Sequence, residues 1–235
     1  MPKVGLAVGD RPMVTWVIEA CVETGVDRCV VVVGFGAQHV RAALAEYDCC
    51  EFVEQKELLG TAHATQAACA CLGNSPPGDV FVLAGDGPLI RSHTLHRLLR
   101  QHRDDNAAVT LATATLDDPT GYGRIVRDAE DRYGRIVEQK DANPEELLIH
   151  EVNPSYYCFR GDRLFKSLGK VERNNKQGEY YLTDVPAVIQ AEGDRVSLMP
   201  DVPPEDVLSI NTPEHLQVVD AVLRRRLAAT EHVTP

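Results

Sequence analysis

The sequence has little that suits a membrane protein, a nucleic-acid-binding protein or a secreted disulfide scaffold. No apolar run approaches the roughly 20 residues of a membrane span, and no signal-peptide-like apolar segment follows Met1. The formal net charge of −11 argues against a general surface for nucleic acid or anionic lipid. The seven cysteines are an odd number and have no zinc-ligand spacing. Small buried thiols in a reducing cytoplasm explain them better than disulfides, so a cytoplasmic protein is expected.

The remaining composition is that of a globular protein, with 44% hydrophobic and 25% charged residues in 235. Apolar strand-like runs alternate with helical segments as far as Leu116, which is typical of βαβ units and a mainly parallel sheet. Helices are expected at 13–24 and 37–45, from the turn at 59–61 to about Leu72, from a Ser92 cap onward, at 184–191 and at 213–228. Strands are expected at 28–34, 51–54, 80–83, 108–115, 150–159 (broken at Asn153-Pro154) and 195–199, with a hairpin of 124–127 and 134–138 added to the sheet.

The stretch 79–90 reads D-V-F-V-L-A-G-D-G-P-L-I. Its apolar run without alternation predicts a strand buried on both faces. Asp86 follows at the carboxyl edge, where open α/β sheets bind their ligands. A hard oxygen ligand framed by small residues suits Mg²⁺. The same carboxylate could instead only cap the next turn, and this stretch by itself leaves both interpretations open.

Five segments, taken in order, resemble the uridylyltransferase domain of the bacterial N-acetylglucosamine-1-phosphate uridylyltransferase family. They are Gln55 with L-G-T-A-H-A at 59–64, G-D-x-P-L-I at 85–90, D-P-T-G-Y-G-R-I-V at 118–126, I-V-E-x-K-D-A at 136–142 and Q-G-E-Y-Y-L-T-D at 177–184. The resemblance implies an α/β fold of the Rossmann-like, three-layer (GT-A-like) kind, with a mixed, mainly parallel sheet and helices on both faces. It also implies a single nucleotidyltransferase domain over 1–235, with a nucleotide-binding half at 1–116, a sugar-binding half at 117–212 and a C-terminal helix at 213–235.

The resemblance further implies a Mg²⁺-dependent reaction of UTP with N-acetylglucosamine-1-phosphate or a related N-acetylhexosamine-1-phosphate. The products would be pyrophosphate and UDP-N-acetylglucosamine, a cell-wall precursor. A sugar-phosphate oxygen attacks the α-phosphorus and pyrophosphate leaves in line, so catalysis depends on positioning and charge neutralisation. These small molecules are the implied partners, with no nucleic acid and no membrane among them. The sequence leaves the oligomeric state open.

The family's functional residues carry over to matching positions of this chain. By resemblance, Asp86 and Asn211 hold the Mg²⁺, although Asn211 could otherwise be only a helix N-cap. Lys3 joins Asp86 in the implied catalytic set. Among the implied substrate-binding residues, Gln55, Gly60 and Thr61 bind uracil. Gly123, Glu138, Asn153 and Thr183 bind the amino sugar and its phosphate, and Tyr181 lies beside the acetamido group. Gly85 is also among the implied substrate-binding residues. Gly123 could instead serve only its turn, and Tyr181 only the core.

The chain departs from the family pattern in two places that bear on function. The family has a buried strand and a loop of the form L-x-x-G-x-G-T-x-M before its Pro-Lys, whereas this chain begins at Pro2-Lys3. That strand would lie between 29–33 and 80–83, so both strands are expected to lack a neighbour and this form to have little activity. Asn153-Pro154-Ser155 stands in place of N-T-G, so an altered sugar pocket is expected. The alternatives are a non-catalytic sugar-nucleotide-binding protein and a nucleotidyltransferase for another sugar or base.

Overall fold

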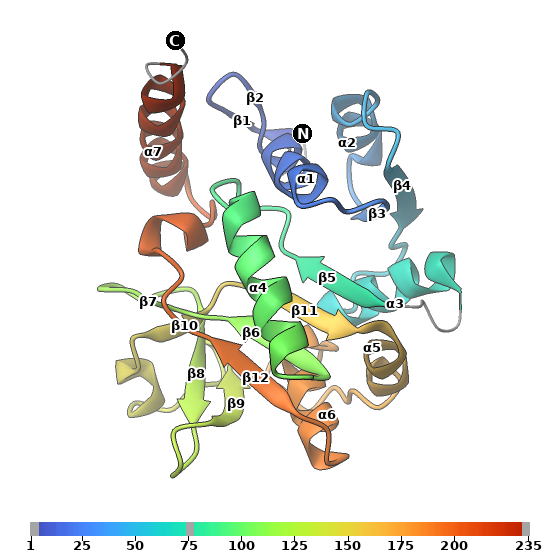
Figure 1. The fold of residues 1–235 in the computed structure, drawn as a ribbon, viewed down its shortest axis with the longest axis vertical. Coiled ribbons are helices and arrows are strands. Elements are labelled where there is room, and N and C mark those ends of the chain that lie inside the picture. The colour runs from blue at the N-terminus through green and yellow to red at the C-terminus, as the bar shows by residue number, and fades with distance from the viewer. Residues whose placement is uncertain (1–4, 74–77, 232–235) are drawn as a thin grey trace.

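Helices and strands alternate along most of the chain (Figure 1). The structure is a computed structural model that describes residues 5–73 and 78–231, so Lys3 lies outside the described residues. The helices are α1 (Met13–Glu23), α2 (Ala37–Ala43), α3 (Thr61–Leu72), α4 (Ser92–Asp104), α5 (Gly161–Leu168), α6 (Val185–Ala191) and α7 (Pro213–Glu231). The strands are β1 (Ala7–Val8), β2 (Arg11–Pro12), β3 (Cys29–Val33), β4 (Cys50–Glu54), β5 (Asp79–Leu83), β6 (Val109–Ala112), β7 (Ala114–Thr115), β8 (Gly123–Arg127), β9 (Tyr133–Val137), β10 (Glu151–Asn153), β11 (Tyr156–Arg160) and β12 (Val196–Met199).

A four-stranded mixed sheet in the order β12-β6-β11-β5 forms the middle layer. β12 runs parallel to β6, whereas β11 runs antiparallel to both β6 and β5. Three of these four strands therefore point the same way, which confirms the mixed, mainly parallel sheet. The carboxyl end of β5 leads directly to Asp86.

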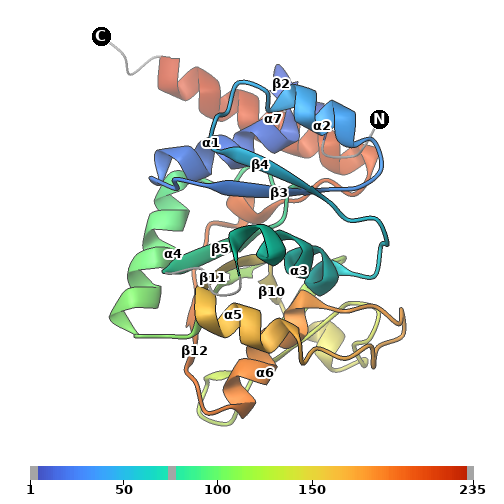
Figure 2. The same cartoon turned by 90° about the vertical axis from the view of Figure 1, so that its right-hand side faces the viewer.

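Apolar side chains on both faces of this sheet hold the helices. In β11, Cys158 packs in a core that includes Leu95 of α4, whereas Tyr157 and Phe159 pack in a second core that includes Leu164 of α5. Alternate residues of a strand point to opposite faces, so the two cores lie on opposite sides of the sheet. Figure 2 shows α4 on one side of β5 and β11, and α3 and α5 on the other. The three-layer arrangement with helices on both faces is thus confirmed.

The hairpin of β8 and β9 belongs to a second, fully antiparallel sheet in the order β7-β10-β8-β9. The prediction that it extends the main sheet is therefore wrong. The expected strand at 108–115 is divided at Thr113, whose backbone N–H donates to Met199 O at 2.9 Å and whose hydroxyl donates to Glu151 Oε1 at 2.6 Å. The predicted break at Asn153-Pro154 is confirmed, with Ser155 in the left-handed region at φ +62°. At each of these two breaks, Thr113 and Asn153-Pro154, the chain passes from one four-stranded sheet to the other.

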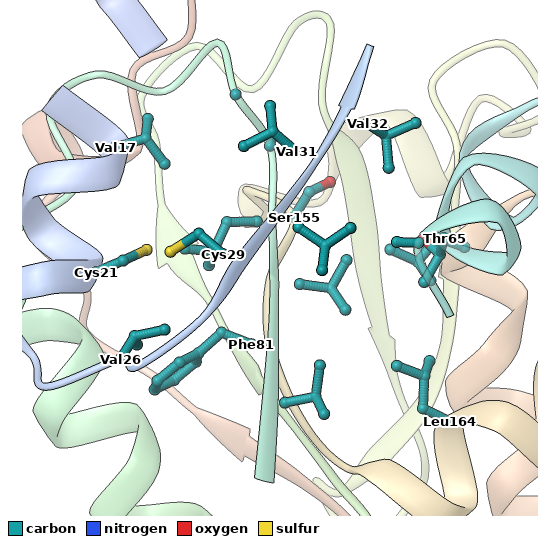
Figure 3. Close-up of a pocket in the computed structure, with 18 of the residues that line it drawn as sticks. Val17, Cys21, Val26, Cys29, Val31, Val32, Thr65, Phe81, Ser155 and Leu164 are labelled. Atoms are coloured by element: carbon teal, nitrogen blue, oxygen red, sulfur yellow. The ribbon is translucent and has the colours of Figure 1, made fainter. Parts of the chain in front are cut away.

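β3 and β4 form a separate parallel pair. Within the described ranges, β3 pairs only with β4, and β5 pairs only with β11. Between β3 and β5 lies a cavity of about 750 Å³, with Val31 and Val32 from one strand and Phe81 from the other among its lining residues (Figure 3). We call this space the β3–β5 slot. Its two open strand edges agree with the expectation that these strands lack a neighbour.

Some local predictions differ from the structure. Helix α5 was not anticipated, although Leu164 and Leu168 lie one turn apart on its buried face. Arg91, in an extended conformation, is the N-cap residue of α4, and Ser92 is already helical, so the predicted Ser92 cap is wrong. Helix α7 continues to Glu231, beyond the expected end. Among the described residues, no helix combines the length and apolarity needed to cross a bilayer.

Candidate active site

Asp86 and Asn211 are brought together by a backbone hydrogen bond, although they are far apart in the sequence. The Ile210 N–H donates to Asp86 O at 3.1 Å, so the residue before Asn211 is fixed to Asp86. Thr212, not Asn211, caps α7, because its hydroxyl accepts from the His215 N–H at 3.2 Å. The alternative role of Asn211 as a simple helix cap therefore does not apply.

This pair of residues fits Mg²⁺ by the chemistry of its donors. Asp86 offers carboxylate oxygens and Asn211 an amide oxygen. Residues 5–73 and 78–231 contain no cluster of three or more His, Cys, Asp or Glu side chains that could hold a metal. Mg²⁺ does not need such a cluster, because it keeps several waters and binds through one or two protein groups together with substrate phosphates. The site therefore suits a Mg²⁺ that shares its coordination with a bound phosphate.

The turn around Gly60 is clamped to the segment that carries Tyr181. The Tyr180 N–H donates to Leu59 O at 2.8 Å, and the Ala62 N–H donates to Tyr180 O at 2.9 Å. The Leu182 N–H donates to Thr61 Oγ1 at 2.9 Å. Three hydrogen bonds thus join the Gly60 turn, which the resemblance assigns to uracil, to the segment of Tyr181, which it assigns to the sugar.

Gly60 makes this close approach possible. Its φ is +112°, and a Cβ added there would lie 2.5 Å from the Tyr180 carbonyl oxygen. The Gln55 side chain fixes the same turn, because its Nε2 donates to Gly60 O at 3.1 Å and lies 3.0 Å from His63 Nδ1. His63 completes this arrangement. Sequence reasoning gave it no role, although it lies in the L-G-T-A-H-A motif.

We expect Gly60→Ala to lower the free energy of unfolding by about 3 kcal/mol, because backbone atoms cannot move aside as a side chain can. Gly25→Ala is the matched control. Gly25 also has a positive φ, +83°, but nothing lies within 4 Å of an added Cβ, so its cost should be about 1 kcal/mol. Urea unfolding of the two variants measures the difference. Equal losses would show that the contact with Tyr180 carries no strain.

The residues assigned to the sugar also converge. Gly123 of β8 pairs with Asn153 of β10, and a Cβ on Gly123 would lie 3.6 Å from Glu138 Oε1. A side-chain hydrogen bond joins Glu138 and Thr183. It lowers the pKa of the Glu138 carboxyl and so partly offsets the rise that burial causes. Asn153 is buried, and its Nδ2 donates to the Tyr157 hydroxyl at 2.6 Å. This bond fixes the Asn153 amide against Tyr157, while its backbone pairs with Gly123.

The β3–β5 slot connects these groups to the end of β5. Its lining includes four residues assigned to the site, namely Thr61, Gly85, Glu138 and Thr183. Ser155, labelled in Figure 3, also lines it. The lining does not include Gln55, Gly60, Asp86, Gly123, Asn153, Tyr181 or Asn211. Those residues are connected to the lining through chain neighbours and the hydrogen bonds described above.

Burial and nearby carboxylates shape the titration of the sugar-side residues. Desolvation raises the pKa of Glu138, and the carboxylates of Asp141 and Asp184 raise it further. Desolvation, with smaller contributions from Asp141 and Glu138, raises the pKa of Tyr181 to about 12. The Tyr181 hydroxyl therefore stays protonated at neutral pH and can donate a hydrogen bond to a ligand oxygen.

The raised pKa of Glu138 predicts a pH-dependent stability. The folded state binds this proton up to a higher pH than the unfolded state does, so stability falls as pH rises above the unfolded pKa of about 4.3. We expect Glu138→Gln to match the parent at pH 4 and to melt at a higher temperature at pH 8.

Glu192→Gln is the control with the opposite sign. Hydrogen bonds from Lys166 and Lys170 lower the pKa of Glu192 to about 2, so the parent gains stability from this carboxylate above its unfolded pKa. The Glu192 variant should melt lower than the parent at pH 8 and approach it at acid pH. A Glu138 variant that follows this second pattern would contradict the assigned burial.

Arg124 is a further residue near the site to which sequence reasoning gave no role of its own. Its side chain is buried, and desolvation lowers its pKa. Nη2 donates to Gln139 Oε1 at 2.8 Å, and that oxygen also accepts from the Gly121 N–H at 3.2 Å. Arg124 thereby fixes the loop that leads into Gly123. It lies in the P-T-G-Y-G-R motif, but nothing in its spacing marks a buried guanidinium.

Comparison with known proteins places this chain among nucleotidyltransferases. Residues 1–177 match the family described as MobA-like NTP transferase domain. The chain is 42% identical over 225 residues to the bifunctional protein GlmU of Geobacillus thermodenitrificans, covering 96% of this chain and 48% of that protein. It is also 42% identical over 228 residues to GlmU of Alkaliphilus oremlandii, covering 97% of this chain and 49% of that protein. The chain thus spans about half the length of these curated relatives.

Solved structures show the same fold at lower sequence identity. A UDP-glucose pyrophosphorylase complexed with UDP-glucose superposes with a TM-score of 0.75 at 18% identity, covering 96% of this chain and 91% of that one. The apo form of a UDP-glucose pyrophosphorylase gives a TM-score of 0.73 at 18% identity, with the same coverage. A structural likeness at 18% sequence identity establishes the fold of this chain.

Proposed function

The chain belongs to the MobA-like NTP transferase family, and from that premise we propose that it is a sugar-1-phosphate uridylyltransferase. Its substrates would be UTP and N-acetylglucosamine-1-phosphate, or a related N-acetylhexosamine-1-phosphate, and it would work with Mg²⁺. The curated relatives named GlmU support this choice of branch. A cytoplasmic role in making the cell-wall precursor UDP-N-acetylglucosamine is part of the proposal.

One observation carries the proposal. The bond from the Ile210 N–H to Asp86 O, 3.1 Å long, keeps Asn211 close to Asp86 after β5, which supports their proposed role as a pair of hard oxygen ligands. Directly before Asp86, Gly85 lines the slot that also reaches Glu138 and Thr183. A metal-bound phosphate and a sugar could therefore occupy neighbouring parts of one site. This is the arrangement that transfer between a nucleotide and a sugar phosphate requires.

The chain's own residues would contribute mainly position. Gln55 and the Gly60 turn would pair with the uracil edge through an amide and backbone groups. Glu138 and Thr183 would bind sugar hydroxyls, and Tyr181 would lie beside the acetamido group. Asp86 and Asn211 would hold the Mg²⁺, which when bound neutralises phosphate charge. Lys3, assigned to the catalytic set by resemblance, lies outside the described residues.

A second candidate is a sugar-nucleotide-binding protein without turnover, and the open β3–β5 slot favours it. Pyrophosphate release separates the two candidates. The enzyme should release pyrophosphate from UTP only when a sugar-1-phosphate and Mg²⁺ are present. The binding protein should bind UDP-N-acetylglucosamine in calorimetry and release none. Competition by UDP-N-acetylgalactosamine and UDP-glucose then tests the sugar, and failure of every N-acetylated ligand to compete would exclude an acetamidohexose site.

We expect Gln55→Ala to reduce the preference for uridine nucleotides over cytidine nucleotides by about 100-fold, because a buried polar edge would lose its partner. Competition of UTP and CTP for the site measures this ratio in either candidate. Lys56→Ala, at an exposed neighbouring position, is the control and should leave the ratio unchanged. An equal preference before and after the Gln55 change would refute its role in reading uracil.

A further inference from the structure

Asp206 is a completely buried carboxylate in the short 3-10 helix Pro204–Val207. Its oxygens accept from Arg91 Nε at 2.9 Å, Thr94 Oγ1 at 3.0 Å and Arg226 Nη2 at 2.7 Å. These donors come from the start of α4 and from α7. A buried charge is tolerated only when it is paired in this way. Asp206 therefore joins three segments through one side chain.

The segment after Asp206 leads to the site through further hydrogen bonds. The Tyr156 hydroxyl donates to Asp206 O at 3.0 Å. The Tyr122 hydroxyl donates to Val207 O at 3.0 Å and accepts from the Ser209 N–H at 3.0 Å. The next residue, Ile210, donates its N–H to Asp86 O. The backbone is thus fixed at nearly every residue between Asp206 and Asn211.

The same carboxylate also acts on the other side of Asp86. Arg226, held by Asp206, donates its Nη1 to Leu89 O at 2.9 Å. Leu89 lies three residues after Asp86, in the turn that takes the chain away from β5. Asp206 therefore restrains both the turn that follows Asp86 and the segment that carries Asn211.

We infer that Asp206 is a positioning residue for the candidate active site, one that holds Asn211 beside Asp86 without touching a ligand. The inference deepens the proposed function and rests on it for the part that concerns metal binding. If the Asp206 charge is removed, Arg91 and Arg226 lose the buried carboxylate that they share, although Glu205 stays 3.5 Å from Arg226 Nη2. The weaker balance of the two positive charges should loosen 207–211 and the turn at Leu89.

Amide hydrogen exchange tests the restraint directly, in the full chain and without a ligand. In Asp206→Asn, the Ser209 and Ile210 amides should exchange at least about tenfold faster than in the parent. The control is Asp105→Asn. Asp105 accepts from Arg195, Gln101 and Ser197, so it matches Asp206 in the number of donating side chains but lies at the far end of α4. Unchanged exchange at Ser209 and Ile210 in a folded Asp206→Asn protein would overturn the inference.

If Asp206→Asn does not fold, Thr94→Val removes one donor while keeping the shape of the side chain. It should still speed exchange at the same two amides, by about threefold, and unchanged exchange there would again overturn the inference. Mn²⁺ binding, followed by electron paramagnetic resonance with UDP-N-acetylglucosamine present, gives the second readout. Affinity should fall about tenfold in Asp206→Asn and stay constant in Asp105→Asn, and an equal fall in both would mean a merely structural role. If the parent binds no Mn²⁺, the proposed function fails, while the exchange result still decides whether Asp206 restrains the segment.

Discussion

Asp86→Asn should reduce the rate of pyrophosphate release at least about 100-fold in a form of the protein that turns over UTP. The change keeps the size of the side chain and removes one fixed negative charge at the end of β5. A metal that neutralises phosphate charge contributes several kcal/mol to transition-state stabilisation, and about 1.4 kcal/mol corresponds to a factor of ten in rate. The loss should appear mainly in kcat, because the charge matters most while pyrophosphate leaves.

Asp79→Asn is the control for this experiment. Asp79 begins the same strand and accepts from Arg103 Nε at 2.8 Å, so its replacement also removes a carboxylate from β5. It also lines the β3–β5 slot, but at the opposite end of β5 from Asp86, and the rate should stay within about twofold of the parent, as expected for a change that touches no group assigned to the reaction. Mg²⁺-dependent pyrophosphate release that survives unchanged in Asp86→Asn would exclude Asp86 as the main metal ligand.

The local part of the site could be predicted from the sequence. Asp86 follows an apolar run that predicts a strand, and the structure places it just after that strand. The prediction that this strand is buried on both faces is wrong, because all five residues of β5 are only half-buried beside the open β3–β5 slot. Asn211 could be assigned only through the family resemblance. Its closeness to Asp86 depends on the bond from Ile210, which no local pattern encodes.

The errors in the predicted fold also arise from contacts between residues that are distant in the sequence. The pattern of 124–138 predicts a hairpin correctly, but the sheet that a hairpin joins is decided by distant partners, here β10. The division of 108–115 between two sheets depends on Thr113, which reads in the sequence as an ordinary strand residue. Asp206 reads as a surface residue in P-P-E-D-V, and only tertiary packing shows that its carboxylate is buried.

The largest expected effect on stability concerns the β3–β5 slot. An added apolar strand seated there should raise the melting temperature by about 10 °C. Each of the two five-residue strands offers an open edge of N–H and C=O groups that a strand between them would pair. Burial of an apolar side chain contributes about 1.5–3 kcal/mol, against an ordering cost of about 1–2 kcal/mol per residue. A net gain of a few kcal/mol corresponds to about 10 °C in a protein of this size.

The comparison sets the 235-residue chain against a form whose amino end is extended by an apolar strand and a loop of the form L-x-x-G-x-G-T-x-M. A matched extension with Lys at alternate strand positions is the control, because it would bury positive charge against the apolar side chains of Val31, Val32 and Phe81. Only the apolar extension should raise the melting temperature. It should also raise the rate of pyrophosphate release, because a nest of backbone amides stabilises triphosphate charge far better than a single lysine side chain. Equal melting temperatures for the three forms would show that no strand occupies the slot. Turnover by the unextended chain at about 1–10³ s⁻¹, the usual range for enzymes, would show that the added loop is dispensable.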